Sequence, residues 1–219
     1  MKKVKHATTV MKVPSSSGKK LPWEAAEELN INHWYRNIYE NMPEVHARLL
    51  YTDTRIHVKF DVKEEYILAK RLQMQDQVCM DSCVEFFFSI GGSEYINYEI
   101  NCIGTYLCYK CRPGRIFDVN PVGLKETDFM ITTSLPRGQA IPEPVECPPG
   151  GYTVEFSIPF AFINGVLGGE APHAGTVWKG NLYKCGDDLT KCHWGSWSEL
   201  LCPELDFHRP EFFKDITFR

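Results

Sequence analysis

The sequence lacks any long apolar run, and this absence limits what kind of protein it encodes. Among its 219 residues, no hydrophobic stretch approaches the ~20 residues that a helix needs to span a bilayer. The chain also lacks a basic excess, since its formal net charge is -4. Nucleic acids and anionic membranes usually attract proteins through basic patches. We therefore expect neither nucleic acid nor a membrane among the partners.

The N-terminal segment lacks the apolar core of a secretory signal. The first 20 residues are rich in lysine, but the apolar stretch of roughly 7–15 residues that such a signal needs does not follow. Taken as a whole gene product, the chain is expected to be cytoplasmic. The expectation changes if the chain is a fragment of a secreted enzyme.

Common catalytic signatures are missing as well. No serine lies in a G-x-S-x-G elbow, no phosphate-binding glycine loop occurs, and the seven histidines are scattered. Cys83 or Cys185 could act as a nucleophile only beside a local base, and the sequence shows none. These patterns leave open whether the protein is an enzyme, and they favour a protein without catalytic activity.

The composition is that of an ordinary soluble globular protein, with 43% hydrophobic and 24% charged residues. The length suits one large all-β domain, which can bury a sizeable core. We expect a single domain over residues 1–219, in which residues 1–20 form a loose strand and a loop. The oligomeric state is not indicated.

Nine cysteines are many for a chain of this kind, and their number is odd. Disulfide scaffolds are typical of short secreted chains, so reduced thiols are the simpler interpretation. The alternative is a zinc site that combines Cys108-x-x-Cys111 with a distant pair such as Cys185 and Cys192. Structural zinc sites usually show two closely spaced pairs, whereas six residues separate this second pair.

The most informative stretch is residues 81–101, D-S-C-V-E-F-F-F-S-I-G-G-S-E-Y-I-N-Y-E-I-N. Its alternation predicts two strands joined by a glycine turn at residues 91–93. This register pairs Phe86 with Tyr98 on an apolar face. It also places Glu85 opposite Glu99 on the other face. That second face, which also carries Asn97 and Asn101, is too rich in polar groups for a plain solvent surface.

The rest of the chain shows short strand patterns separated by turn signals. Strands are expected at 2–13, 47–51, 55–62, 105–110, 130–135, 152–158 and 176–183. A helix is expected at 21–30 and one helical turn at 160–167, with loops at 14–20 and 136–151 and irregular structure at 117–129. The pattern predicts an all-β fold, a jelly-roll-like antiparallel β-sandwich with one or two short helices.

Two tryptophans lie three residues apart in H-W-G-S-W-S, at Trp194 and Trp197. The stretch has no helical or strand periodicity, so we expect a loop. Tryptophans often pack into a core, but loops run over the surface. An exposed ring offers a flat apolar plate to the C–H face of a sugar. We expect at least one of the two to face a ligand.

Four motifs together identify a family resemblance. They are V-x-x-D-S-C-V-E-F-F-F, Y-x-N-Y-E-I-N-x-I-G-T, W-K-G-N-L-Y-K-C-G-D and H-W-G-S-W-S. These motifs closely resemble carbohydrate-binding module family 9-like proteins, which are β-sandwich domains similar to the sugar-binding modules of bacterial xylanases. The similarity extends over nearly the whole chain, from residue 49 to residue 212.

The resemblance implies a sugar held between two tryptophans, with a glutamate and amides on its hydroxyl groups. Glu85 matches that glutamate, but Cys79 stands where one of the tryptophans is expected, six residues earlier. The sugar contacts that the resemblance suggests are Glu85, Asn97, Glu99, Asn101, Arg112, Asn181, Trp194 and Trp197. It also suggests Ca²⁺, which binds carboxylate and backbone oxygens, with Asp187-Asp188 as candidate ligands. A solvated acidic turn is the simpler interpretation of those two residues, and no cofactor is certain.

We therefore expect non-catalytic binding of xylan- or cellulose-type oligosaccharides, or of their sugar ends, on the polar face. Two alternatives remain open. Glu85 and Glu99 could form the carboxyl pair of an O-glycosyl hydrolase, or serve as structural acids paired with Lys110 or Lys184. Cys79, in turn, would suit an interaction domain that has kept the fold and lost the sugar site.

Overall fold

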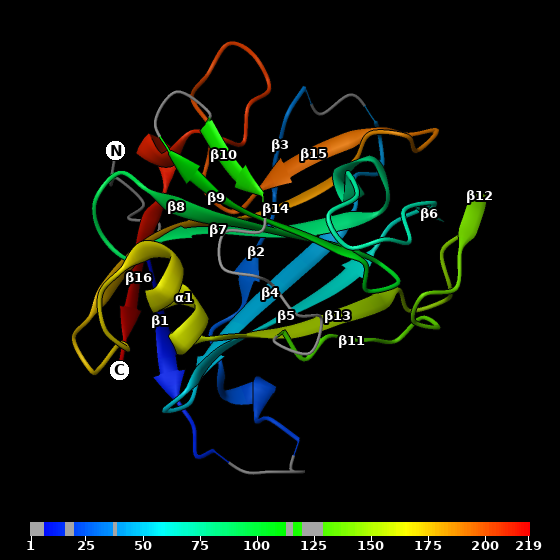
Figure 1. Cartoon of the computed structure of the whole chain (residues 1–219). Coiled ribbons are helices and arrows are strands. Elements are labelled where there is room, and N and C mark those ends of the chain that lie inside the picture. The colour runs from blue at the N-terminus through cyan, green and yellow to red at the C-terminus, as the bar shows by residue number, and fades with distance from the viewer. Residues whose placement is uncertain (1–6, 16–19, 37–38, 113–115, 120–128) are drawn as a thin grey trace.

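The computed structural model describes residues 7–15, 20–36, 39–112, 116–119 and 129–219. Most of its strands form one continuous sheet that curls over itself into two layers (Figure 1). The fold is mostly β with a short helix, which confirms the predicted sandwich-like all-β architecture. Among the described residues, no helix has the length and apolar character needed to cross a membrane.

One layer, called the site layer below, has the strand order β10-β9-β8-β7-β14-β16. Strand β14 continues past β16 and pairs there with β15, which in turn pairs with β3. The bounds of these strands are β3 His33–Trp34, β7 Cys83–Ser89, β8 Tyr95–Asn101, β9 Tyr106–Arg112, β10 Ile116–Val119, β14 Val177–Gly186, β15 His193–Ser196 and β16 Lys214–Phe218.

The opposite layer, called the back layer, has the order β4-β5-β13-β11, with β2 against β4. A separate small sheet pairs β6 with β12. The bounds are β2 Leu29–Asn30, β4 Glu44–Tyr51, β5 Arg55–Lys63, β6 Tyr66–Ala69, β11 Thr132–Thr133, β12 Ile141–Glu146 and β13 Tyr152–Pro159. The helices are η1 Trp23–Ala25, η2 Val78–Met80, α1 Phe160–Leu167 and η4 Pro210–Phe212.

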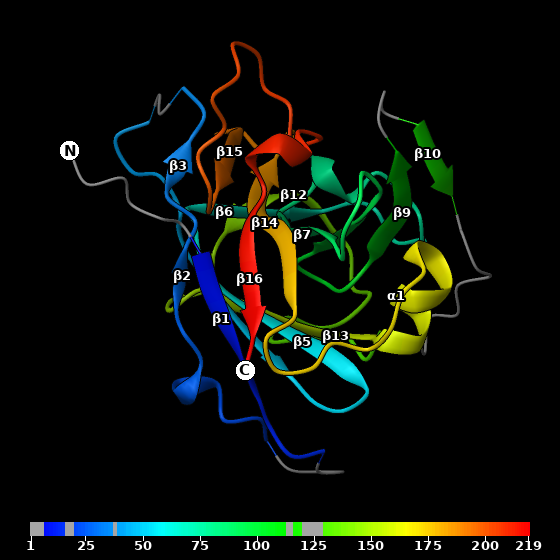
Figure 2. The same ribbon diagram turned by 90° about the vertical axis from the view of Figure 1, so that its left-hand side faces the viewer.

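Strand β1 (Ala7–Lys12) joins the two layers. Its first residues pair with β16 and its last two with β4, in parallel both times. Figure 2 shows β1 beside β16, so the first and last strands of the chain lie side by side. The prediction of a purely antiparallel sandwich is therefore wrong for β1, which pairs in parallel with both neighbours. Parallel neighbours need a long connection, and here nearly the whole chain provides it.

The core lies between the two layers and is rich in aromatic side chains. Phe86 and Phe88 of β7 stack on each other with ring centroids 4.7 Å apart, and Tyr98 packs on Phe156 of the back layer at 5.0 Å. These residues come from alternate strand positions, as expected when one face of each strand meets the core. The apolar face predicted for the β7–β8 hairpin is confirmed as core.

The predicted hairpin register is also confirmed, with Glu85 opposite Glu99 and Phe86 opposite Tyr98. Gly91 and Gly92 have positive φ angles of 137° and 77°, which a glycine turn accommodates without a Cβ clash. Every residue of β7 and β8 is buried on both faces. The outer face is covered because side chains such as Phe207 and Phe213 pack on it.

The structure corrects four predictions. The helix expected at 21–30 is only the 3-10 turn η1, because Leu29 and Ile31 are buried beside β4. The expected loop 136–151 contains β12, whose prolines fit because β12 is an edge strand. The H-W-G-S-W-S stretch is largely β15. Strand β11 is shorter than the expected 130–135.

The remaining boundaries are close to those predicted, with one exception. Helix α1 lies at the expected helical turn, and β13 and β14 lie at their expected strands. The irregular structure expected from residue 117 is wrong for residues 117–119, which belong to β10. Residues 1–6, 16–19 and 120–128 lie outside the described residues, so the predictions that fall on them are not tested.

Candidate functional site

The candidate site lies on the outer face of the site layer, away from the sandwich core. Successive rows of side chains cross this face because paired residues on neighbouring strands point the same way. One row runs from Glu99 on β8 through Glu85 on β7 to Tyr183 on β14. The next contains Cys83, Cys185 and Trp194. Local alternation thus brings acids, thiols and an indole ring together.

Three residues of these rows, Glu99, Glu85 and Cys185, form the floor of a cavity of about 160 Å³. The walls come from η2, from the end of β14, from β15 and from the segment 205–208. The lining residues are Cys79, Glu85, Phe87, Glu99, Cys185, Asp187, Trp194, Leu205, Asp206, Phe207 and His208. The floor carboxylates are almost fully enclosed, with Glu85 2% and Glu99 6% exposed.

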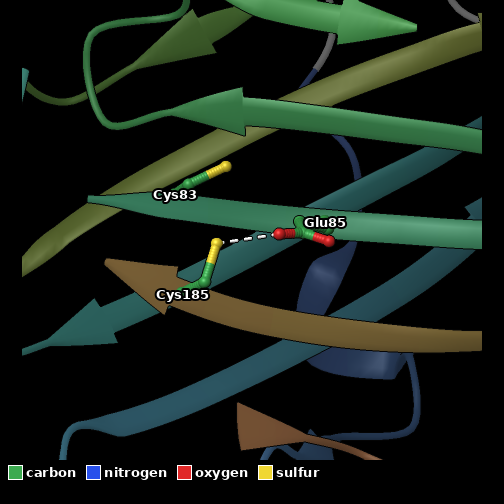
Figure 3. A group of neighbouring side chains, drawn as sticks. All are labelled: Cys83, Glu85 and Cys185. Atoms are coloured by element: carbon green, nitrogen blue, oxygen red, sulfur yellow. Dashed lines mark hydrogen bonds between the residues drawn. The ribbon is translucent and has the colours of Figure 1, made fainter. Parts of the chain in front are cut away.

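Each floor carboxylate accepts one hydrogen bond from a neighbour. The Cys185 thiol donates to Glu85 Oε1 at 2.8 Å, a contact drawn in Figure 3. The Asn97 amide donates to Glu99 Oε1 at 2.7 Å, and Asn97 Oδ1 in turn accepts from the Tyr109 backbone N–H. Glu99 Oε2 is buried and has no hydrogen-bond partner among the described residues. The floor therefore keeps acceptor capacity for a ligand.

Burial makes both acids hard to ionise. Desolvation and the nearby Glu99 charge raise the pKa of Glu85 well above its usual value, against a smaller opposing effect of the Cys185 hydrogen bond. Desolvation also raises the pKa of Glu99, to about 8, although the Asn97 hydrogen bond opposes it. Near neutral pH both carboxyl groups are therefore mostly protonated. A protonated carboxyl group can both donate to and accept from a ligand hydroxyl.

The predicted structural partners of these acids lie elsewhere. Lys184 points to the other side of β14, where its Nζ is 2.9 Å from Glu64 Oε2 and both side chains are buried. Lys110 pairs with Glu94 at 2.9 Å. The interpretation of Glu85 and Glu99 as acids paired with either lysine is therefore wrong.

Aromatic rings line the sides of the cavity. Trp194 is half-buried, and its Nε1 donates to Asp187 Oδ1 at 2.5 Å, which fixes the indole at the rim. Phe207 stacks on Tyr183 with ring centroids 4.2 Å apart and planes inclined by 15°. His208 lies near Phe87 at 5.1 Å. The arrangement offers apolar ring surface beside buried carboxyl groups.

Four of the eight predicted contact residues line this cavity or bind a residue that does: Glu85, Glu99 and Trp194 line it, and Asn97 holds Glu99. The other four lie elsewhere. Trp197 is 6% exposed and packs in the main core. It cannot serve as a surface plate.

The other three have structural partners. Asn101 donates to Asp81 and to the Arg71 carbonyl. Asn181 binds the Ser198 backbone through both its amide atoms, and Arg112 pairs with Glu94 at 3.1 Å. Sequence reasoning did not list Cys185, Phe207 or His208. Cys185 follows from the β7–β14 register, whereas the segment 205–208 has no periodic pattern.

The structure tests the predicted zinc pair but leaves the predicted calcium ligands open. Cys108 packs in the main core and Cys111 on the outer face, because residues three apart in a strand point to opposite sides. The proposed zinc pair 108/111 is therefore wrong. In the acidic turn, Asp187 accepts from Trp194 and Asp188 pairs with Arg71 at 2.7 Å. Both carboxylates are satisfied by protein groups, and their role as calcium ligands remains a prediction.

Comparisons with solved structures agree with this architecture. A predicted carbohydrate-binding protein from Bacteroides uniformis has 26% sequence identity and a TM-score of 0.82, covering 97% of this chain and 99% of that one. A family 9 carbohydrate-binding module from Caldicellulosiruptor kristjanssonii, solved with cellotriose, has 14% identity and a TM-score of 0.63, over 97% and 93% of the two chains. The same module solved with glucose gives 0.62 at 14% identity, over 97% and 96%.

No curated protein shows significant sequence similarity to the chain. The model of the carbohydrate-binding family 9, in contrast, matches residues 16–218, which is nearly the whole sequence. The same span contains both sandwich layers and every residue that lines the cavity. The chain belongs to carbohydrate-binding family 9.

Proposed function

We propose that this protein binds a carbohydrate, without transforming it, in the cavity above Glu85 and Glu99. The observation that carries the proposal is the pair of buried carboxyl groups on the floor of a cavity walled by Trp194 and Phe207. Family membership supports it independently, because the match includes the whole cavity.

The chemistry of the lining suits a sugar ring. Sugar hydroxyl groups donate to the carbonyl oxygen of a protonated carboxyl group and accept from its O–H. The rings of Trp194 and Phe207 bury the apolar C–H face. A volume of about 160 Å³ is small for a ligand site, so the cavity suits a single sugar unit such as a chain end.

The ligand we favour is a glucose or xylose unit at the end of a cellulose- or xylan-type oligosaccharide. Cellotriose and glucose are bound by the Caldicellulosiruptor kristjanssonii module, whose fold this chain shares. Affinity should be modest, since a small polar ligand offers few atoms and its hydroxyl groups are costly to desolvate. Cys79, which lines the cavity, stands where the family resemblance implies a second tryptophan, and this also favours weak binding.

The test is isothermal titration of the purified protein with glucose, xylose, cellobiose and xylobiose, followed by analysis of each mixture for products. We expect saturable heat with at least one sugar, no product, and loss of the heat in Glu85→Gln. Glu24→Gln is the matched control, because Glu24 is exposed on η1, outside the cavity. No heat with any of these sugars would contradict the proposal and favour a family fold without a sugar site. Product formation would instead identify a hydrolase.

A further inference from the structure

An unusual group of metal-binding atoms borders the cavity, which Glu85 and Cys185 line and the fully buried Cys83 does not. Cys83, Glu85 and Cys185 each offer one ligand atom, and these atoms all lie within 4.8 Å of one another. Figure 3 shows the three side chains on the neighbouring strands β7 and β14. Cys83 and Cys185 are directly opposed in the register, and Glu85 lies two residues after Cys83. Two rigid strands therefore hold the group together.

A second, independent observation points to a missing ligand at the same place. Glu99 lines the same cavity as Glu85 and Cys185, and it is 6% exposed. Its Oε2 has no hydrogen-bond partner among the described residues. An unpartnered carboxylate oxygen in a buried position is costly, and a cation would remove that cost.

We propose that this cluster binds a thiophilic divalent cation of the zinc type, with Cys83, Cys185 and Glu85 as ligands and the nearby Glu99 carboxyl group offsetting its charge. Thiolate sulfur and carboxylate oxygen are the donors that Zn²⁺ accepts in a tetrahedral site. Ligand atoms about 2.1–2.3 Å from such an ion lie roughly 3.5–3.8 Å apart. The distances between the three ligand atoms, now at most 4.8 Å, therefore need to shorten by no more than about 1.3 Å.

Proton balance follows from the same contacts. The Cys185 thiol is protonated and donates a hydrogen bond to Glu85. The buried Cys83 thiol is protonated as well, because desolvation raises its pKa to about 12. Binding of the cation forms two metal–sulfur bonds and releases one proton from each thiol to the solvent. Glu85 must also give up its proton to coordinate the ion, and the positive charge favours loss of the proton on Glu99. The oxidation states of sulfur and metal do not change.

One consequence rests on the proposed function. Glu85 and Glu99 would serve both the cation and the sugar, and a bound ion would occupy the floor of a cavity of only about 160 Å³. The two ligands should therefore exclude each other. Metal binding itself does not depend on sugar binding.

The test is a titration of the reduced protein with Cd²⁺ alone, followed through the ultraviolet thiolate-to-cadmium charge-transfer band. We expect one equivalent to saturate the band, release of protons into a weakly buffered solution, and displacement of Cd²⁺ by Zn²⁺. Cys185→Ser and Cys83→Ser should each weaken Cd²⁺ binding at least tenfold. Cys147→Ser is the matched control, because Cys147 is half-buried and does not line the cavity.

The cadmium and sugar titrations together decide whether the metal site and the sugar site exist. No band at one equivalent, or an unchanged band in the Cys83→Ser/Cys185→Ser double variant, would overturn the proposal. If a serine variant fails to fold by circular dichroism, Glu85→Gln keeps both thiols and should still weaken binding. Sugar heat without a cadmium band would contradict only the metal site. A cadmium band without sugar heat would contradict only the sugar site.

Discussion

At the scale of single residues, the cavity depends on two acids that burial keeps from ionising. Glu85 and Glu99 face each other across β7 and β8 on the covered side of the site layer. Two like charges in this position would repel each other. Protonation of both groups removes that repulsion, and a bound cation would offset it.

The raised pKa of Glu99 gives a prediction for stability against pH. Its folded-state pKa of about 8 lies above the usual 4.5, so the folded protein holds a proton more tightly than the unfolded chain. This contribution to the free energy of unfolding is fully present below about pH 4.5 and is lost as the pH rises through about 8. We expect the wild-type protein to lose on the order of a few kcal/mol over that range.

In Glu99→Gln the same loss should be smaller, because the titrating group is gone. Urea unfolding at pH 5, 7 and 8.5 measures the difference, with Glu24→Gln as the control. Equal losses in the wild type and in Glu99→Gln would show that this carboxyl group keeps an ordinary pKa.

Replacing Trp194 in β15 and replacing Trp197 just after β15 should affect different properties of the protein. Trp197 is buried in the main core, so Trp197→Ala should lower the free energy of unfolding by about 3–5 kcal/mol. Trp194 is half-buried at the cavity rim. Trp194→Ala should therefore weaken sugar binding about tenfold and cost much less stability. Thermal unfolding and calorimetric titration of both variants test this. A stability loss in Trp194→Ala as large as that in Trp197→Ala would contradict it.

At the scale of elements, a buried ion pair ties β14 to the segment between β5 and β6. The Lys184 Nζ lies 2.9 Å from Glu64 Oε2, and Tyr152 on β13 donates to Glu64 Oε1 at 2.7 Å. Burial alone would raise the pKa of Glu64, but Lys184 and His193 outweigh it and hold the pKa at about 2. The contribution of Glu64 is therefore present above its usual pKa of 4.5 and is lost only as the pH falls through about 2.

Breaking this pair should be costly. Glu64→Gln or Lys184→Met alone leaves an uncompensated buried group, so each should lower the free energy of unfolding by about 3–5 kcal/mol. The double variant should recover part of that loss, because neither charge is then left unpaired. Denaturant unfolding of the three variants measures the coupling. Additive losses in the double variant would contradict a direct interaction between the two charges.

The elements also show what local sequence can and cannot reveal. The β7–β8 register was predictable because strand alternation and the glycine turn are both local signals. The W-E-A-A-E-E-L stretch favours a helix by propensity. Tertiary packing overrides that preference, since Leu29 and Ile31 are buried against β4.

In the candidate site, too, some features follow from local sequence and others depend on tertiary packing. Its floor follows from one hairpin, and Glu85 and Glu99 were predicted for that reason. The wall formed by Phe207 and His208 depends on where the segment after β15 folds back over the site layer. No period in the sequence encodes that position. Trp197 was misplaced because its surroundings resemble a loop, although β15 runs into it and turns its ring into the core.

At the scale of the whole molecule, β1 closes the sandwich. It pairs with β16 of the site layer and β4 of the back layer, and its side chains Thr8 and Val10 are buried. A chain truncated to begin at residue 13 would expose the edges of both layers. We expect its thermal unfolding to occur at a markedly lower temperature than that of the full chain. An unchanged unfolding temperature would mean that the layers hold together without β1.

The parallel pairing of β1 with β16 also has a mechanical consequence. Ala7 lies opposite Asp215 and Val10 opposite Phe218, so the chain enters at one end of this strand pair and leaves at the other. Opposite pulls on the two termini would run along the strands and load all hydrogen bonds of the pair at once, in shear. The bonds could not then open one after another, as they do in a hairpin pulled apart from its open end. The first and last strands together act as a force-resisting clamp on the domain.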